Sequence, residues 1–118
     1  MSKATDRYLY VIRTLYAQRP RVRSVDVAKQ LGLTKATVCV AVRQLSDRGL
    51  LKVESDGHLQ LSDAAMLRAG ELCDRASFFC RVLSSAGVEP SLAMKDAVAF
   101  GWEMSETSFE AFRAMLPR

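Results

Sequence analysis

The sequence predicts a mainly α-helical fold with one small β-hairpin. Most segments carry apolar residues at helical spacing, and a short helix and a longer one follow each other across a glycine turn. A single Asp-Gly pair also separates two short segments in which apolar and polar residues alternate. With 118 residues, 49% of them hydrophobic, the chain is long enough to bury a core.

The chain opens with one helix and a second, shorter one. Apolar residues at helical spacing, including two tyrosines, predict the first helix over residues 4–18, and Pro20 follows its end. Ser24 is a predicted N-cap for the short helix over residues 25–31. Gly32 supplies the left-handed residue that commonly ends a helix.

A third helix and a hairpin follow. Thr34 is the predicted N-cap of the third helix, which ends at Gly49. The Asp56-Gly57 pair is a strong signal for a two-residue hairpin turn. The apolar residues on either side of that turn are expected to face the core together: Leu51, Val53, Leu59 and Leu61.

The second half of the chain is predicted to contain helices only. Ser62 is the expected N-cap of a long helix over residues 63–85, and Gly87 interrupts the pattern. Residues 90–104 form the next predicted helix, and a last one starts near Ser105. This order of elements predicts a winged helix-turn-helix domain over residues 1–62 and a helical region over residues 63–118.

The charge of the chain is unevenly distributed between these two regions. Residues 1–62 hold 11 Lys and Arg against 5 Asp and Glu, which gives a net charge of +6. Residues 63–118 hold 6 against 8, a net charge of −2. A basic region joined to a slightly acidic one is typical of a polyanion-binding domain with a non-binding part attached.

The outward face of the third helix favours insertion into a DNA groove. Small and apolar side chains allow close approach to base edges and suit contact with thymine methyl groups, whereas a merely solvated face normally carries more charge. The wing and the basic residues before the second helix add phosphate donors, although His58 is better explained as an exposed histidine than as a ligand. The candidate DNA-binding residues are Arg21, Arg23, Thr34, Lys35, Ala36, Thr37, Cys39, Val40, Arg43, Gln44, Lys52 and His58.

Other classes of protein have little support in the sequence. We find no nucleophile–base arrangement and no glycine-rich phosphate loop, so we do not expect an enzyme. Neither a signal peptide nor a long apolar run is present, which favours a cytoplasmic protein with no membrane partner. The three cysteines lack CxxC spacing, and Cys73 and Cys80 at helical spacing are more typical of packing than of a redox sensor.

With these elements in place, the sequence resembles the iron- and manganese-dependent repressors of the diphtheria toxin repressor and manganese transport regulator type. The matching segments are DRYLYVIRTLY, VDVAKQLGLTKATVCVAVRQLSDRGLLKV, ESDGHLQLS and GVEPSLAMKDAVAFGWEMS. The resemblance implies a homodimer that binds a palindromic operator in double-stranded DNA and dimerises through its C-terminal helices. It also implies that bases are read by Thr34, Ala36, Thr37, Cys39 and Val40.

The resemblance fails at the metal ligands. The positions at which such repressors bind Mn²⁺ or Fe²⁺ correspond here to Arg7, Tyr10, Ala76, Val98, Gly101 and Trp102. These residues offer neither the carboxylates nor the imidazoles that such ions prefer. We therefore expect no metal cofactor and a regulator that is metal-independent or has another effector.

Two alternatives remain. One is a metal-dependent repressor with a rebuilt site that uses Asp6, Asp74, Cys80 or Glu103. The other is a winged-helix adaptor that binds proteins and has stopped binding DNA. The basic first region and the small side chains of the third helix argue against the adaptor.

Overall fold

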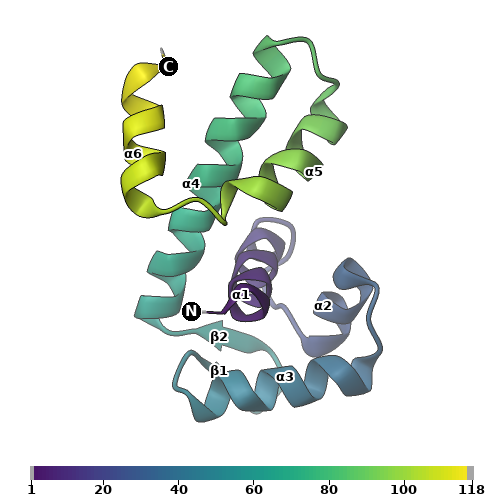
Figure 1. Cartoon of the computed structure of the whole chain (residues 1–118). Coiled ribbons are helices and arrows are strands. Elements are labelled where there is room, and N and C mark those ends of the chain that lie inside the picture. The colour runs from purple at the N-terminus through teal and green to yellow at the C-terminus, as the bar shows by residue number, and fades with distance from the viewer. Residues whose placement is uncertain (1, 117–118) are drawn as a thin grey trace. The chain divides into compact units, whose positions relative to one another are not determined.

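The helices and strands lie close to their predicted positions. The computed structural model describes residues 2–116. Its elements (Figure 1) are α1 (Lys3–Tyr16), α2 (Ser24–Leu31), α3 (Lys35–Asp47), β1 (Leu51–Val53), β2 (Leu59–Leu61), α4 (Asp63–Ser85), α5 (Pro90–Gly101) and α6 (Glu106–Met115). The predicted fold class is therefore confirmed.

The described residues divide into two compact units within helix α4. The first unit extends to Gly70 and holds α1, α2, α3, the hairpin and the start of α4. The second begins at Glu71 and holds the rest of α4 with α5 and α6. The functional division expected at residue 62 stays a prediction.

The first unit has its own hydrophobic core. Its helices turn their apolar faces inward, and the leucines of the hairpin cover the same core. The Tyr16 hydroxyl joins α1 to β2, because it donates to the Leu59 carbonyl at 2.8 Å and accepts from the Leu61 N–H at 3.1 Å. The fully buried residues include Leu9, Ile12, Val22, Val27, Val38 and Leu59.

The two strands pair as the Asp-Gly turn predicts. β1 and β2 are antiparallel, with Leu51 opposite Leu61 and Val53 opposite Leu59. Gly57 has a φ of +88°, a left-handed conformation that side chains resist. The segment before α2 lies beside β2, since the Leu59 N–H donates to the Val22 carbonyl at 2.7 Å.

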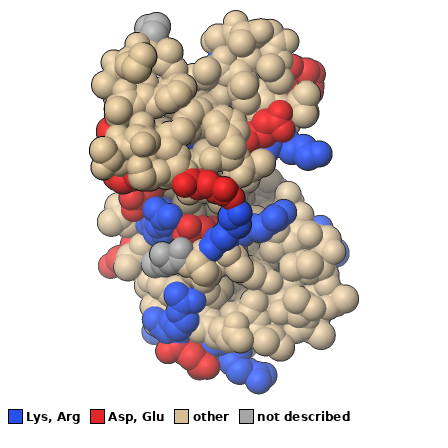
Figure 2. Space-filling model, in the orientation of Figure 1, with Lys and Arg blue, Asp and Glu red and all other residues tan. Residues whose placement is uncertain are grey.

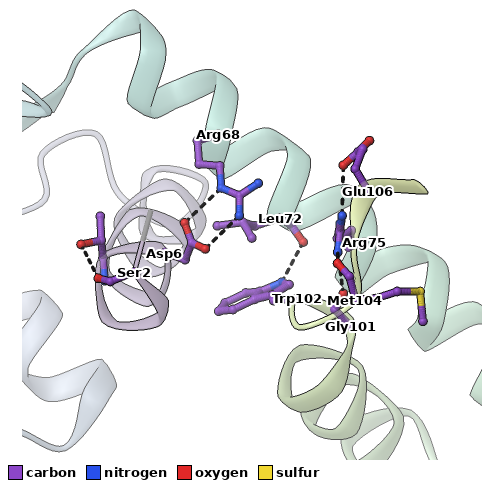
Figure 3. A network of polar contacts seen from close by, with 10 residues as sticks. Ser2, Asp6, Arg68, Leu72, Arg75, Gly101, Trp102, Met104 and Glu106 are labelled. Carbon is purple, nitrogen blue, oxygen red and sulfur yellow. Dashed lines mark hydrogen bonds and ion pairs between the residues drawn. The ribbon is translucent and has the colours of Figure 1, made fainter. Parts of the chain in front are cut away.

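The second unit is built around phenylalanines and one buried arginine. Phe78 and Phe79 of α4 meet Phe109 of α6 with ring centroids 5.7 and 5.9 Å apart. The Arg75 guanidinium donates to the Gly101 and Met104 carbonyls and to Glu106, as Figure 3 shows. Arg75 thereby satisfies the Gly101 carbonyl, which has no helical partner at the end of α5, and the Met104 carbonyl in the turn that follows.

Three local predictions need correction. The N-cap of α2 is Arg23, whose N–H donates to Asp26 at 2.8 Å, and Ser24 is the first helical residue. Helix α5 ends at Gly101 and not at Met104, because Arg75 holds the carbonyls of both residues and Ser105 then caps α6. Val53 is 51% exposed, since the last residue of β1 lies on the turn side of the hairpin, beyond the core.

Candidate nucleic-acid interface

Helix α3 is held by a capped N-terminus and an apolar inner face. The Thr34 hydroxyl accepts from the Thr37 N–H at 3.1 Å, as the sequence predicted, and also bonds the Thr37 hydroxyl at 2.8 Å. Val38, Val42 and Leu45 are buried. One face of the helix is therefore fixed in the core while the opposite face is free to meet a partner.

The outward face of α3 carries every candidate that the sequence assigned to it. It carries two cations, Lys35 in the first turn and Arg43 two turns further along, and neither forms an ion pair with another described residue. Between them the surface is small and apolar, with Val40 at 56% exposed. The exposed residues of this surface are Lys35, Ala36, Thr37, Cys39, Val40, Arg43 and Gln44.

The hairpin of β1 and β2 forms the wing, and it carries an exposed lysine and a histidine that contacts a carboxylate. Lys52 of β1 is exposed and pairs across the hairpin with Gln60. His58 is half-buried, and its ring Nδ1 lies 2.5 Å from the Asp56 carboxylate. His58 also forms a bridge with Arg23, which places the basic segment before α2 next to the wing.

The basic residues before α2 are all paired with carboxylates. Arg19 lies 2.5 Å from Asp26, and Arg21 bonds the Asp56 carboxylate. Arg23 donates from Nε to the Asp56 carbonyl at 3.1 Å, and its Nη2 lies 3.6 Å from the carboxylate. Sequence reasoning placed Arg21 and Arg23 among phosphate donors but missed their common partner. The sequence marked Asp56 only as a turn residue, and nothing local to it pointed to Arg21 or Arg23.

The electrostatics of Asp56 follow from these contacts. Hydrogen bonds from the His58 side chain and backbone N–H, together with the Arg21 guanidinium, hold the pKa of Asp56 well below its ordinary value. Acidic residues also stand beside basic ones on the face of the molecule in Figure 2. The positive charge of the first region is thus partly compensated by its own carboxylates.

The expected metal positions of the first unit do not form a ligand set. Arg7 is exposed and carries a fixed positive charge, and Tyr10 is half-buried. The neighbouring carboxylate, Asp6, is only 5% exposed and is held by Arg68 of α4 through two bonds of 3.0 and 2.9 Å (Figure 3). A carboxylate already bound by two guanidinium donors is a poor ligand for a divalent ion.

The positions of the second unit are no better suited. Ala76 is buried, and Val98 is half-buried and has no donor atom in its side chain. A Cβ at Gly101 would lie 3.0 Å from the Phe79 ring, so even the first atom of a ligand side chain is crowded. The Trp102 indole N–H donates to the Leu72 carbonyl at 3.2 Å. These residues do not fit a manganese or iron(II) site.

The residues considered for a rebuilt site and for thiol chemistry are dispersed. Asp74 and Glu103 are exposed, and Cys80 is half-buried like Cys73. Cys39 is exposed on α3, and none of the three cysteines forms a disulfide bond within residues 2–116. Within residues 2–116, no three His, Cys, Asp or Glu side chains come together in an arrangement that could hold a metal ion.

The fold and the exposed α3 face define a winged helix-turn-helix protein. A family model described as MarR family matches residues 4–58. The chain is 29% identical over 108 residues to the transcriptional regulator MntR of Escherichia coli O6:H1, a match that covers 92% of this chain and 70% of that protein.

Solved structures confirm the fold. A manganese-dependent transcriptional repressor in complex with manganese superposes with a TM-score of 0.80 at 21% identity, over 94% of this chain and 51% of that one. IdeR of T. acidophilum has a TM-score of 0.79 at 15% identity, over 100% of this chain and 56% of that one. The chain thus spans about half the length of these two proteins. None of the helices in the described part of the chain has the length and hydropathy needed to cross a membrane.

Proposed function

We propose that this chain is a sequence-specific DNA-binding transcriptional regulator that requires no divalent metal. The single observation that carries the proposal is the outward face of α3, where small and apolar side chains lie between two cations, Lys35 and Arg43, that form no ion pair with another described residue. Small side chains permit groove entry, and Lys35 and Arg43 supply phosphate or base contacts. The similarity to transcriptional regulators supports the same reading.

A repressor acting as a homodimer through its C-terminal helices completes the proposal. Helices α5 and α6 carry exposed large apolar side chains, among them Leu92, Phe100, Phe112 and Met115. Such side chains favour burial against a second copy. Two-fold symmetry would then match a palindromic operator. Sedimentation of the purified protein at several concentrations measures its oligomeric state. A monomer at every concentration would contradict the proposed homodimer.

Substitution of the two cations of α3 tests DNA binding. The double variant Lys35→Ala, Arg43→Ala removes two phosphate or base donors. We expect the slope of log affinity against log salt to fall by about 1 to 2, with a loss of affinity of at least about tenfold at low salt. Fluorescence anisotropy with duplex DNA measures both quantities.

The matched control is Arg81→Ala, Lys95→Ala. It removes the same charge from exposed positions of the second unit. If the proposal is right, the control keeps the wild-type salt slope. Equal effects of the two double variants would mean that only net charge matters and that α3 is not the reading element.

The second candidate is a metal-dependent repressor, which is favoured by the similarity to a manganese-dependent protein. In that case a site rebuilt from Asp6, Asp74, Cys80 or Glu103 would bind the ion. The Arg68 pair on Asp6 argues against it. Thermal unfolding with added manganese distinguishes the two candidates. Metal binding to the folded state raises Tm, and tighter binding raises it further, whereas the proposal expects no shift.

A further inference from the structure

The tip of the wing holds a carboxylate surrounded by donors. Asp56 Oδ2 accepts from Arg21 and lies 3.6 Å from Arg23 Nη2. Its other oxygen, Oδ1, lies 2.5 Å from the His58 ring and 3.1 Å from the His58 backbone nitrogen. Two arginines and a histidine from two separate segments therefore converge on one anion.

This arrangement also suits a phosphate. Carboxylate and phosphate each offer a pair of oxygens that can accept two parallel N–H bonds from the planar guanidinium of arginine. A guanidinium N–H that donates to Asp56 is not available to another acceptor at the same time. Arg21 therefore meets either its internal carboxylate or a phosphate of DNA with this donor. Arg23 donates from Nε to the Asp56 backbone carbonyl, and its Nη2 charge, 3.6 Å from the carboxylate, is partly neutralised by it.

The cluster is accessible to DNA. The side chains of Arg21 and Arg23 are 60% and 45% exposed, and that of Asp56 is 33% exposed. An ion pair in contact with water is weak, so an external phosphate can compete for its donors. The wing hairpin follows α3 directly in the chain, within the same compact unit.

We propose that Asp56 is an intramolecular competitor that holds Arg21 and Arg23 away from the DNA backbone and so lowers the electrostatic part of DNA affinity. The inference rests on the proposed DNA-binding function and adds its regulation by an internal anion. Without this carboxylate, the wing would add two phosphate donors to those of α3. The protein would then bind any duplex more tightly and release it more slowly.

Asp56→Asn tests the proposal with little risk to the fold. Asn-Gly is the most favoured two-residue hairpin turn, so the substitution keeps the wing while it removes the charge. We expect Asp56→Asn to bind a random-sequence duplex about three- to tenfold more tightly at about 50 to 100 mM salt. The slope of log affinity against log salt should steepen by about 1 to 2, because the carboxylate that neutralises the two guanidinium charges is removed.

Two further variants show whether the gain in DNA affinity depends on Arg21 and Arg23. Glu54→Gln removes an equal charge from the same hairpin, and in residues 2–116 Glu54 forms no ion pair with either arginine. Its affinity should change by less than about twofold, with an unchanged slope. Adding Arg21→Gln and Arg23→Gln to Asp56→Asn should return both quantities to wild-type values.

The outcomes separate the two proposals. A wild-type chain that binds no duplex at any salt concentration overturns the proposed function itself. If the wild type binds DNA but Asp56→Asn binds equally or more weakly while its Tm stays within a few degrees, the competitor role is wrong. If Glu54→Gln changed DNA affinity as much as Asp56→Asn, the effect would come from net charge alone, and the competitor role of Asp56 would also be wrong.

Discussion

At the scale of single residues, Asp56 has a measurable consequence for pH. Its lowered pKa means that the folded state prefers the ionised carboxylate more than the unfolded chain does. The stabilising contribution is fully present above the ordinary value of about 3.9 and is lost as pH falls toward the lowered one. The Asp56–Arg21 contact is therefore intact at neutral pH.

We accordingly predict a pH-dependent difference between wild type and Asp56→Asn. The difference in Tm should shrink as pH falls below about 4, where the unfolded chain gains a proton first. Thermal unfolding followed by circular dichroism over this range measures it. A difference that does not change with pH would show that the carboxylate and its partners do not interact in solution.

Arg75 is the second residue with a clear energetic role. It is only 5% exposed, it donates to two carbonyls and Glu106, and its guanidinium lies 4.8 Å from the centroid of the Phe109 ring. Replacing it removes charge-assisted bonds and leaves the Gly101 and Met104 carbonyls without this donor. Unsatisfied buried acceptors are among the costliest defects in a folded protein.

We predict that Arg75→Met lowers the free energy of unfolding by about 2 to 4 kcal/mol in urea titrations. Glu106→Gln is the matched control, since the Glu106 side chain is 64% exposed and its loss should cost less than about 1 kcal/mol. Should both variants unfold at the same urea concentration as wild type, Arg75 would not be the residue that joins α4 to the turn after α5.

At the scale of elements, two glycines of the helical region have different roles. A Cβ at Gly101 would lie 3.0 Å from the Phe79 ring, which is itself packed against Phe100 and Phe109. A Cβ at Gly70 would meet only the end of the Arg13 side chain, at 3.4 Å. The first position requires glycine for packing, and the second tolerates a methyl group.

We predict opposite effects of alanine at these two sites. Gly101→Ala should destabilise by about 1 to 3 kcal/mol, because the aromatic cluster must move to admit the methyl group. Gly70→Ala should be neutral or stabilise by up to about 1 kcal/mol, since alanine favours a helix interior. Urea unfolding of the two variants checks the pair, and a stabilising Gly101→Ala would contradict the described packing.

The elements also show how far sequence reasoning extends. Thr34 and the Asp-Gly turn were predictable because caps and turns depend on neighbours within a few residues. The end of α5 was not, because it depends on Arg75, 26 residues from Gly101 in the chain. In the same way, Arg21 and Arg23 were recognised as basic residues, but Asp56 lies 35 residues from Arg21, and only the folded hairpin brings them together.

For the whole molecule, the net charge of +4 does not show that the positive charge is concentrated in the first half of the chain. In that half, three arginines form ion pairs with aspartates: Arg19, Arg21 and Arg23. Lys35, Arg43 and Lys52 carry no ion pair among the described residues. On our account these three cations, with the apolar centre of α3, determine where and how strongly DNA binds.

The absence of fitting ligands at the expected metal positions is the other feature that belongs to the molecule as a whole. Six positions in both halves of the chain would have to supply carboxylates and imidazoles, and they carry Arg7, Tyr10, Ala76, Val98, Gly101 and Trp102 instead. A single substitution is easily compensated, whereas replacement of the entire set points to loss of the requirement. We therefore propose that the protein recognises DNA without a divalent metal.

The most direct test is selection of bound sequences from a pool of random-sequence duplexes by the purified protein, once in chelator and once with manganese. We predict enrichment of one palindromic sequence in chelator and the same enrichment with manganese. Enrichment that occurs only with manganese would contradict the claim and would require a rebuilt metal site.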